Sequence, residues 1–62
     1  DKADYLYRIA NIYVSLGNYQ QGVSYAEQAL AIEPEDGRCY LLIGFSGLLM
    51  DHYIGHQLIS QN

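Results

Sequence analysis

Two histidines near the C-terminal end have the spacing that comes closest to a metal site. His52 and His56 are four residues apart, so on a helix their imidazoles would share one face and could meet one metal ion. The sequence offers no evident third ligand, and no glutamate lies between them in the arrangement of a metalloprotease. We therefore interpret both as surface histidines and expect no bound metal and no cofactor.

The remaining reactive residues do not form a catalytic set. Cys39 is the single cysteine of the chain; a position near a helix start would lower its pKa, but without a nearby histidine or second cysteine we interpret it as a packing residue. Glu33, Glu35 and Asp36 cluster around the single proline, which is typical of a solvated turn. The sequence contains no Ser-His-Asp set and no Gly-rich phosphate loop. We expect a protein that is not an enzyme.

Size and charge limit both the core and the choice of partner. A chain of 62 residues buries only about 60% of the surface that its unfolded form exposes, so its core is marginal and needs support. With three basic residues against seven acidic ones, a nucleic-acid surface is not expected. The sequence shows no apolar run of about 18 residues and no signal peptide, so we expect no membrane contact and assign no compartment beyond a cytoplasmic default.

Helical periodicity organises the first half of the chain into two segments. Between residues 1 and 16, apolar residues recur three or four positions apart, at Leu6, Ile9, Ala10 and Tyr13, which predicts an amphipathic helix. Gly17 and Asn18 tolerate a left-handed backbone, so they favour a helix end and a tight reversal. The same periodicity resumes at Tyr19 and predicts a second helix that ends near Ile32.

The second half of the chain leaves two arrangements open. Pro34 ends the second helix, and Asp36 can cap a third helix that extends to about Met50. Residues 53–61 could form a fourth helix. Alternatively, because Asp51 and His52 replace the glycine-asparagine pair of the first turn, the third and fourth helices could run on as one, and a swapped dimer would then restore the packing. No segment alternates as a strand does, so the fold class is all-α.

A repeat of 34 residues is visible in the sequence. This separation pairs Leu6 with Tyr40, Ile9 with Ile43, Ala10 with Gly44 and Tyr19 with Tyr53. The pattern of Leu6, Ile9, Ala10, Tyr13, Gly22, Ala26 and Pro34, and above all the stretch GNYQQGVSYAEQALAIEP, resembles the tetratricopeptide repeat. The resemblance implies antiparallel helical hairpins stacked as a short solenoid, with a first repeat at 3–36 and a second, incomplete or degenerate repeat at 37–62. So short an array needs self-association, domain swapping or further repeats to be stable.

The resemblance also implies a binding surface, since first helices of such repeats line a concave face that receives a peptide or a helix. On that face the first repeat is mixed and polar, whereas the second is apolar. The expected partner-binding residues are Tyr7, Asn11, Val14, Arg38, Leu41, Phe45 and Leu48, with Ser15, Leu42 and Leu49 on the same side. An alternative is that the leucines and Phe45 are simply core, covered by neighbouring repeats or by a second copy.

Three functions remain compatible with the sequence. We expect a protein-protein interaction scaffold; the alternatives are a secretion-type chaperone that shields apolar segments of exported subunits, and a self-associating structural segment, a homodimer in the simplest case. One family site is missing. Members that clamp acidic chaperone tails use a lysine and two asparagines where this chain has Tyr7, Asn11 and Leu42. Tyr5, Tyr7 and Tyr25 lie outside the repeat positions and are free candidates for a binding surface.

Overall fold

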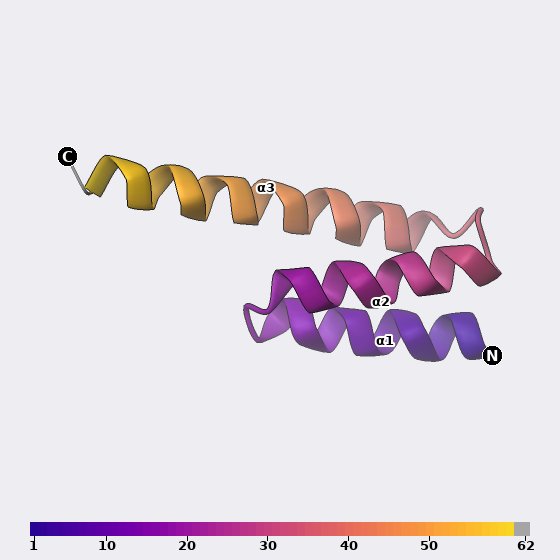
Figure 1. The fold of residues 1–62 in the computed structure, drawn as a ribbon. Helices are drawn as coiled ribbons and strands as arrows, with labels where there is room; N and C mark the ends of the chain where they lie inside the picture. Colours follow the sequence, from indigo (N-terminus) through magenta and orange to yellow (C-terminus); the bar gives the residue numbers. More distant parts are fainter. Residues whose placement is uncertain (61–62) are drawn as a thin grey trace.

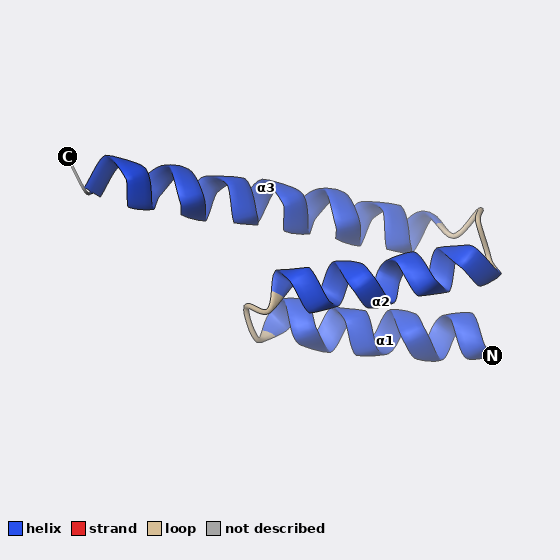
Figure 2. Cartoon of the chain, viewed as in Figure 1, coloured by secondary structure: helices blue, strands red, loops and turns tan. Residues whose placement is uncertain are grey.

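Three helices make up the part of the chain that the structure describes. The computed structural model describes the backbone of residues 1–60 and the side chains of residues 1–51. The helices are α1 (Lys2–Ser15), α2 (Tyr19–Ile32) and α3 (Gly37–Ser60), with no strand between residues 1 and 60 (Figure 2). Helices α1 and α2 form an antiparallel hairpin, and α3 runs back along α2 (Figure 1). The predicted all-α fold of packed helical hairpins is confirmed.

The ends of α1 follow from local hydrogen bonding. Asp1 caps the start, because its carboxylate accepts a bond of 3.1 Å from the Ala3 N–H. At the other end Gly17 has a φ of +86°, a left-handed conformation that costs glycine little. The Asn18 N–H then donates to the Tyr13 carbonyl at 2.9 Å and the Gly17 N–H to the Val14 carbonyl at 3.0 Å. These two bonds form a Schellman motif, and they confirm the predicted reversal.

The second connection is built around Pro34 and Asp36. Helix α2 ends at Ile32, as predicted. The Asp36 carboxylate accepts a hydrogen bond of 3.0 Å from the Arg38 backbone N–H. The backbone carbonyl of Asp36 accepts one of 3.2 Å from the Cys39 N–H. Both bonds use donors that a helix start leaves without partners. The Tyr40 hydroxyl donates to the Pro34 carbonyl at 2.9 Å and ties α3 to the loop. The predicted cap at Asp36 is confirmed.

The prediction of a separate fourth helix is wrong. Helix α3 continues without a break from Gly37 to Ser60, which is the arrangement named above as the alternative. In the first repeat, Gly17 takes a positive φ at the turn, whereas no other residue of the described part does so. Asp51 stands at the equivalent position, and its Cβ disfavours that conformation. Figure 1 shows that α3 therefore extends past the turn between α1 and α2.

The core is a thin layer of small side chains between the helices. Its buried residues are Leu6, Ala10, Ala26, Ala29, Cys39 and Leu42, with Tyr7, Val14, Tyr25, Leu30 and Ile43 packed against them. Alanines allow α1 and α2 to approach closely, and Leu42 brings α3 onto the hairpin. A layer this thin buries few large side chains, so each of them contributes a large share of the stability.

Candidate functional site

An open groove lies between α1 and the first half of α3. Its volume is about 530 Å³, and its lining residues are Tyr7, Asn11, Val14, Ser15, Arg38, Leu41, Leu42, Phe45 and Leu49. On α1 the spacing of Tyr7, Asn11 and Val14 places them on one helical face. Six of the seven residues expected from the sequence thus line one groove. The seventh, Leu48, is not among the lining residues and is 72% exposed on α3.

The α3 side of the groove is apolar and largely open to solvent. Leu41 is 77% exposed and Phe45 is 58% exposed, whereas Leu42 is only 7% exposed. Within this chain Leu42 is core, whereas Leu41 and Phe45 are not covered. Their burial by neighbouring repeats or by a second copy stays a prediction. Large apolar side chains that remain exposed beside one another are typical of a surface that another molecule covers.

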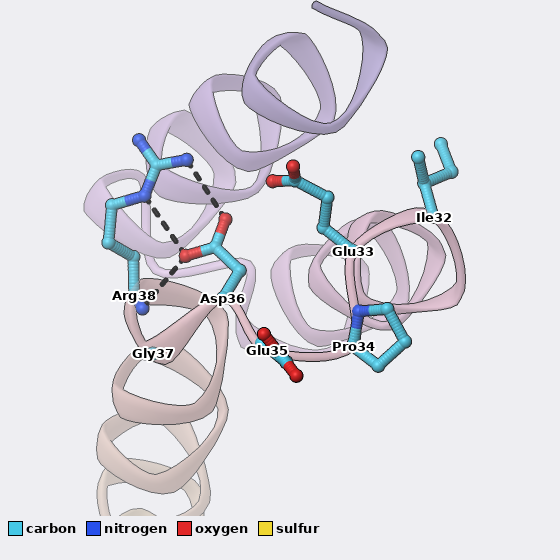
Figure 3. A pocket seen from close by; sticks show the side chains of 7 residues that line it. All are labelled: Ile32, Glu33, Pro34, Glu35, Asp36, Gly37 and Arg38. Carbon is cyan, nitrogen blue, oxygen red and sulfur yellow. Dashed lines mark hydrogen bonds and ion pairs between the residues drawn. The ribbon is translucent and has the colours of Figure 1, made fainter.

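Arg38 closes one end of the groove and connects α1 to α3. Its guanidinium donates to Asp4 on α1 at 2.9 Å and to both oxygens of Asp36, at 3.1 and 2.9 Å. The same guanidinium lies 4.4 Å from the centre of the Tyr7 ring, within the range of a cation–π contact. Figure 3 shows the bonds between Arg38 and Asp36. The guanidinium of Arg38, which lines the groove, is thus already paired with the carboxylates of Asp4 and Asp36.

The spacing of Asp4 and Arg38 in the sequence is a signal for the ion pair between them. Asp4 and Arg38 are 34 residues apart, so they occupy equivalent positions in successive repeats. Equivalent positions of neighbouring repeats lie side by side in a solenoid, because each repeat contacts only its neighbours. Opposite charges at such positions therefore predict an ion pair between repeats.

These ion pairs make the stability depend on pH in acid. Hydrogen bonds from Arg38 hold the pKa values of Asp4 and Asp36 below the usual 3.8, against an opposing effect of burial. A depressed folded-state pKa stabilises the fold above the unfolded value and loses this effect as the pH falls through the folded value. We expect the midpoint of thermal unfolding to fall as the pH decreases below about 4, and Arg38→Gln to flatten this decrease. Circular dichroism between neutral and acid pH measures it.

Lys2→Gln is the matched control for this experiment, since it removes one positive charge without touching either aspartate pair. All three ion pairs among residues 1–51 involve Arg8 or Arg38. The control variant should keep the acid-dependent decrease of the wild type. A decrease that Arg38→Gln leaves unchanged would contradict the assignment.

The structure also gives the surroundings of Tyr25 and Cys39, two other residues that the sequence singled out. The rings of Tyr13 and Tyr25 stack with centroids 5.4 Å apart and an angle of 5° between their planes, so Tyr25 joins α2 to α1 and is not a free candidate. Cys39 is buried; burial and the neighbouring Asp36 carboxylate raise the pKa of its thiol. Both effects disfavour the reactive thiolate, which agrees with a packing role.

A second hollow lies at the loop between α2 and α3. Its volume is about 580 Å³, and it is lined by the consecutive residues 32–38. Figure 3 shows Glu33, Glu35 and Asp36 around it, with Arg38 bonded to Asp36. We do not assign a ligand to this hollow, because one continuous loop forms it and its side chains are those of a helix cap. Residues 1–51 contain no group of three potential metal ligands, and the side chains of His52 and His56 lie outside the described residues.

A comparison with models of protein families identifies the family of the chain. The model of the tetratricopeptide repeat matches residues 3–36, which is more than half of the chain, so the chain belongs to the tetratricopeptide repeat family. Residues 37–62 lie outside the match, and their assignment to a second, incomplete repeat stays a prediction. No curated protein and no solved structure matches the chain.

Membership of the family has a direct implication for function. Tetratricopeptide repeats are generally non-catalytic modules that bind protein partners. None of the helices described is long and apolar enough to cross a membrane.

Proposed function

We propose that this chain is a non-catalytic interaction module that binds an apolar peptide or helix of a partner protein in the groove between α1 and α3. The observation that supports it most is the exposure of Leu41 and Phe45, 77% and 58% respectively, beside the half-buried Tyr7 and Val14. Covering such side chains removes apolar surface from water at about 25 cal/mol per Å². The polar Asn11 and Ser15 at the α1 wall can orient the ligand by hydrogen bonds.

The charges around the groove favour an apolar ligand over an acidic one. An anionic peptide end needs a free cation, and the Arg38 guanidinium, which lines the groove, already binds Asp4 and Asp36. The net charge of −4 opposes an acidic ligand as well. We infer that the ligand is held by its apolar side chains and carries no essential acidic group. A secretion-type chaperone would use the same groove, with an exported apolar segment as its ligand.

A selected peptide tests this proposal. Peptides from a random display library that bind the wild-type chain should be enriched in apolar residues. Fluorescence anisotropy with one of them then compares two variants. Phe45→Asp should weaken binding at least tenfold, because aromatic anchors in grooves commonly contribute 2 kcal/mol or more. Leu16→Asp introduces the same charge at a leucine that is 76% exposed outside the groove and should leave affinity within about twofold.

The two variants also define how the proposal fails. If both weaken binding equally, the peptide does not use the groove. A library that returns mainly acidic peptides would contradict the apolar character of the ligand. Circular dichroism of each variant establishes that helix content is retained.

A further inference from the structure

The contact between α1 and α2 shows which face of a first helix its partner helix covers. On α1, Ala3, Leu6 and Ala10 are buried and Tyr13 is half-buried. Their spacing of three or four residues places them on one side of α1. Tyr13 stacks on Tyr25 of α2, and the backbone at Gly22 of α2 approaches Ala10 closely. This face of α1 is therefore the one that packs against α2.

The equivalent face of α3 has no partner in this chain. Adding 34 to the four α1 positions gives Gly37, Tyr40, Gly44 and Gly47, and all four are exposed. Tyr40 is 57% exposed, and a Cβ built on any of the three glycines would meet nothing within 4 Å. The face is separate from the buried side of α3, which consists of Cys39, Leu42 and Ser46; α2 is the helix against which α3 mainly packs.

The continuity of α3 explains why its own chain cannot cover this face. The residues equivalent to Tyr19–Ala26 of α2 are 53–60. They are part of the same unbroken helix, and a straight helix cannot fold back on itself. They extend past the hairpin turn (Figure 1), where a second copy of the chain can reach them. An element that leaves its own repeat in this way can exchange with the same element of another copy.

We propose that two copies of this chain associate through α3, which pairs antiparallel with its counterpart about a two-fold axis at Asp51. The second half of each α3 then covers the exposed face of the other at Gly44 and Gly47, in the place that α2 has on α1. A two-fold axis requires that each contact be made twice, by the same surface of both copies.

The sequence of α3 fits this symmetry. Positions on one side of a helix recur at intervals of three and four, and from Tyr40 such positions are 40, 44, 47, 51, 55 and 58. These intervals read the same in both directions from Asp51. Gly47 of one copy would therefore lie opposite position 55, which is also glycine, and Gly44 opposite position 58. Small residues at a crossing allow helices to approach closely, as Gly22 does between α1 and α2.

The dimensions of α3 fit this pairing. A helix of 24 residues is about 36 Å long, and residues 52–60, about 14 Å of it, lie opposite residues 42–50 of the other copy. The two hairpins lie at opposite ends of the pair, because α3 extends beyond its own hairpin. The groove lies on another side of α3, so the dimer would present two copies of it. The inference therefore does not depend on the proposed ligand.

Disulfide trapping tests both the pairing and its direction. All variants carry Cys39→Ala, so that the introduced cysteines are the only ones. Asp51→Cys should form a disulfide-linked dimer under mild oxidation, because position 51 faces itself across the axis. Gly47→Cys alone should remain unlinked, but Gly47→Cys with Gly55→Cys should link two chains. Within one helix these positions are about 12 Å apart along the axis, too far for a disulfide.

Three results would overturn the proposal. Equal linking of Asp51→Cys and Gly47→Cys would indicate parallel or random association. A disulfide within one chain of the double variant would show that residues after 51 fold back as a hairpin. Absence of linked Asp51→Cys, together with a monomer by analytical ultracentrifugation at every concentration of the wild-type chain, would leave the face to another occupant, such as a further segment of a longer chain or a different protein.

A charge substitution gives a readout that does not need cysteines. The two Asp51 side chains approach each other at the axis, and like charges repel. Asp51→Asn should therefore lower the dissociation constant of the dimer several-fold at low ionic strength. Asp1→Asn removes the same charge at the far end of the hairpin and should leave the constant unchanged. Equal dissociation constants for Asp51→Asn and wild type would contradict an axis at this position.

Discussion

Leu42→Ala is expected to destabilise the fold by about 2–3 kcal/mol, whereas Leu41→Ala should change the free energy of unfolding by less than about 0.5 kcal/mol. The two leucines are adjacent in α3, but Leu42 is 7% exposed and Leu41 is 77% exposed. Leu42 belongs to the core cluster that joins α3 to the hairpin. Its truncation removes buried apolar atoms and leaves a cavity, and both effects reduce stability.

The comparison between Leu41→Ala and Leu42→Ala isolates the effect of burial on the free energy of unfolding. Both substitutions exchange the same side chains within the same helix, so the change in helix propensity is the same. A chain of 62 residues has a stability of only about 3–9 kcal/mol, so the loss at Leu42 is a large fraction of it. Urea denaturation followed by circular dichroism measures both free energies. Equal values for the two variants would contradict the packing of α3 on the hairpin.

Local signals made the ends of the helices predictable from the sequence. Gly17 is the residue type that a left-handed turn favours, and Asp36 is a preferred cap that stands just after a proline. Each acts on backbone groups within a few residues, so no knowledge of the tertiary fold was needed. The groove was expected from the resemblance to the tetratricopeptide repeat, and the repeat of 34 residues then places Tyr7 and Leu41 on equivalent faces of successive first helices.

Other features depend on how the helices pack, and the sequence alone did not decide them. Leu41 and Leu42 are the same residue type, and only the position of α2 determines that one is buried and the other exposed. The continuation of α3 through Asp51 depended on the absence of a turn signal, which leaves both a hairpin and a long helix open. Leu48 was expected in the groove because it repeats at helical spacing, but it is not among the lining residues and is 72% exposed.

The close approach of α1 and α2 leads to the second large expected effect, which compares two glycine-to-alanine substitutions. A Cβ at Gly22 would lie 2.5 Å from Val14 Cγ2 and 3.0 Å from the Ala10 carbonyl oxygen, whereas a Cβ at Gly44 would meet nothing within 4 Å. We expect Gly22→Ala to destabilise the fold by about 1–2 kcal/mol and Gly44→Ala to stabilise it by about 1 kcal/mol. Thermal and urea unfolding measure the difference, at chain concentrations below the dissociation constant of the proposed dimer, because Gly44 lies at its crossing.

The opposite signs have one physical basis. Alanine is favoured over glycine in a helix by about 1 kcal/mol, and both sites gain this amount. At Gly22 the gain is outweighed, because a carbonyl oxygen of the α1 backbone cannot move aside and Val14 has one strongly preferred rotamer in a helix. Stabilisation by Gly22→Ala would contradict this contact. Since Val14 also lines the groove, its displacement should weaken peptide binding as well, which would link the packing of the hairpin to the shape of the binding surface.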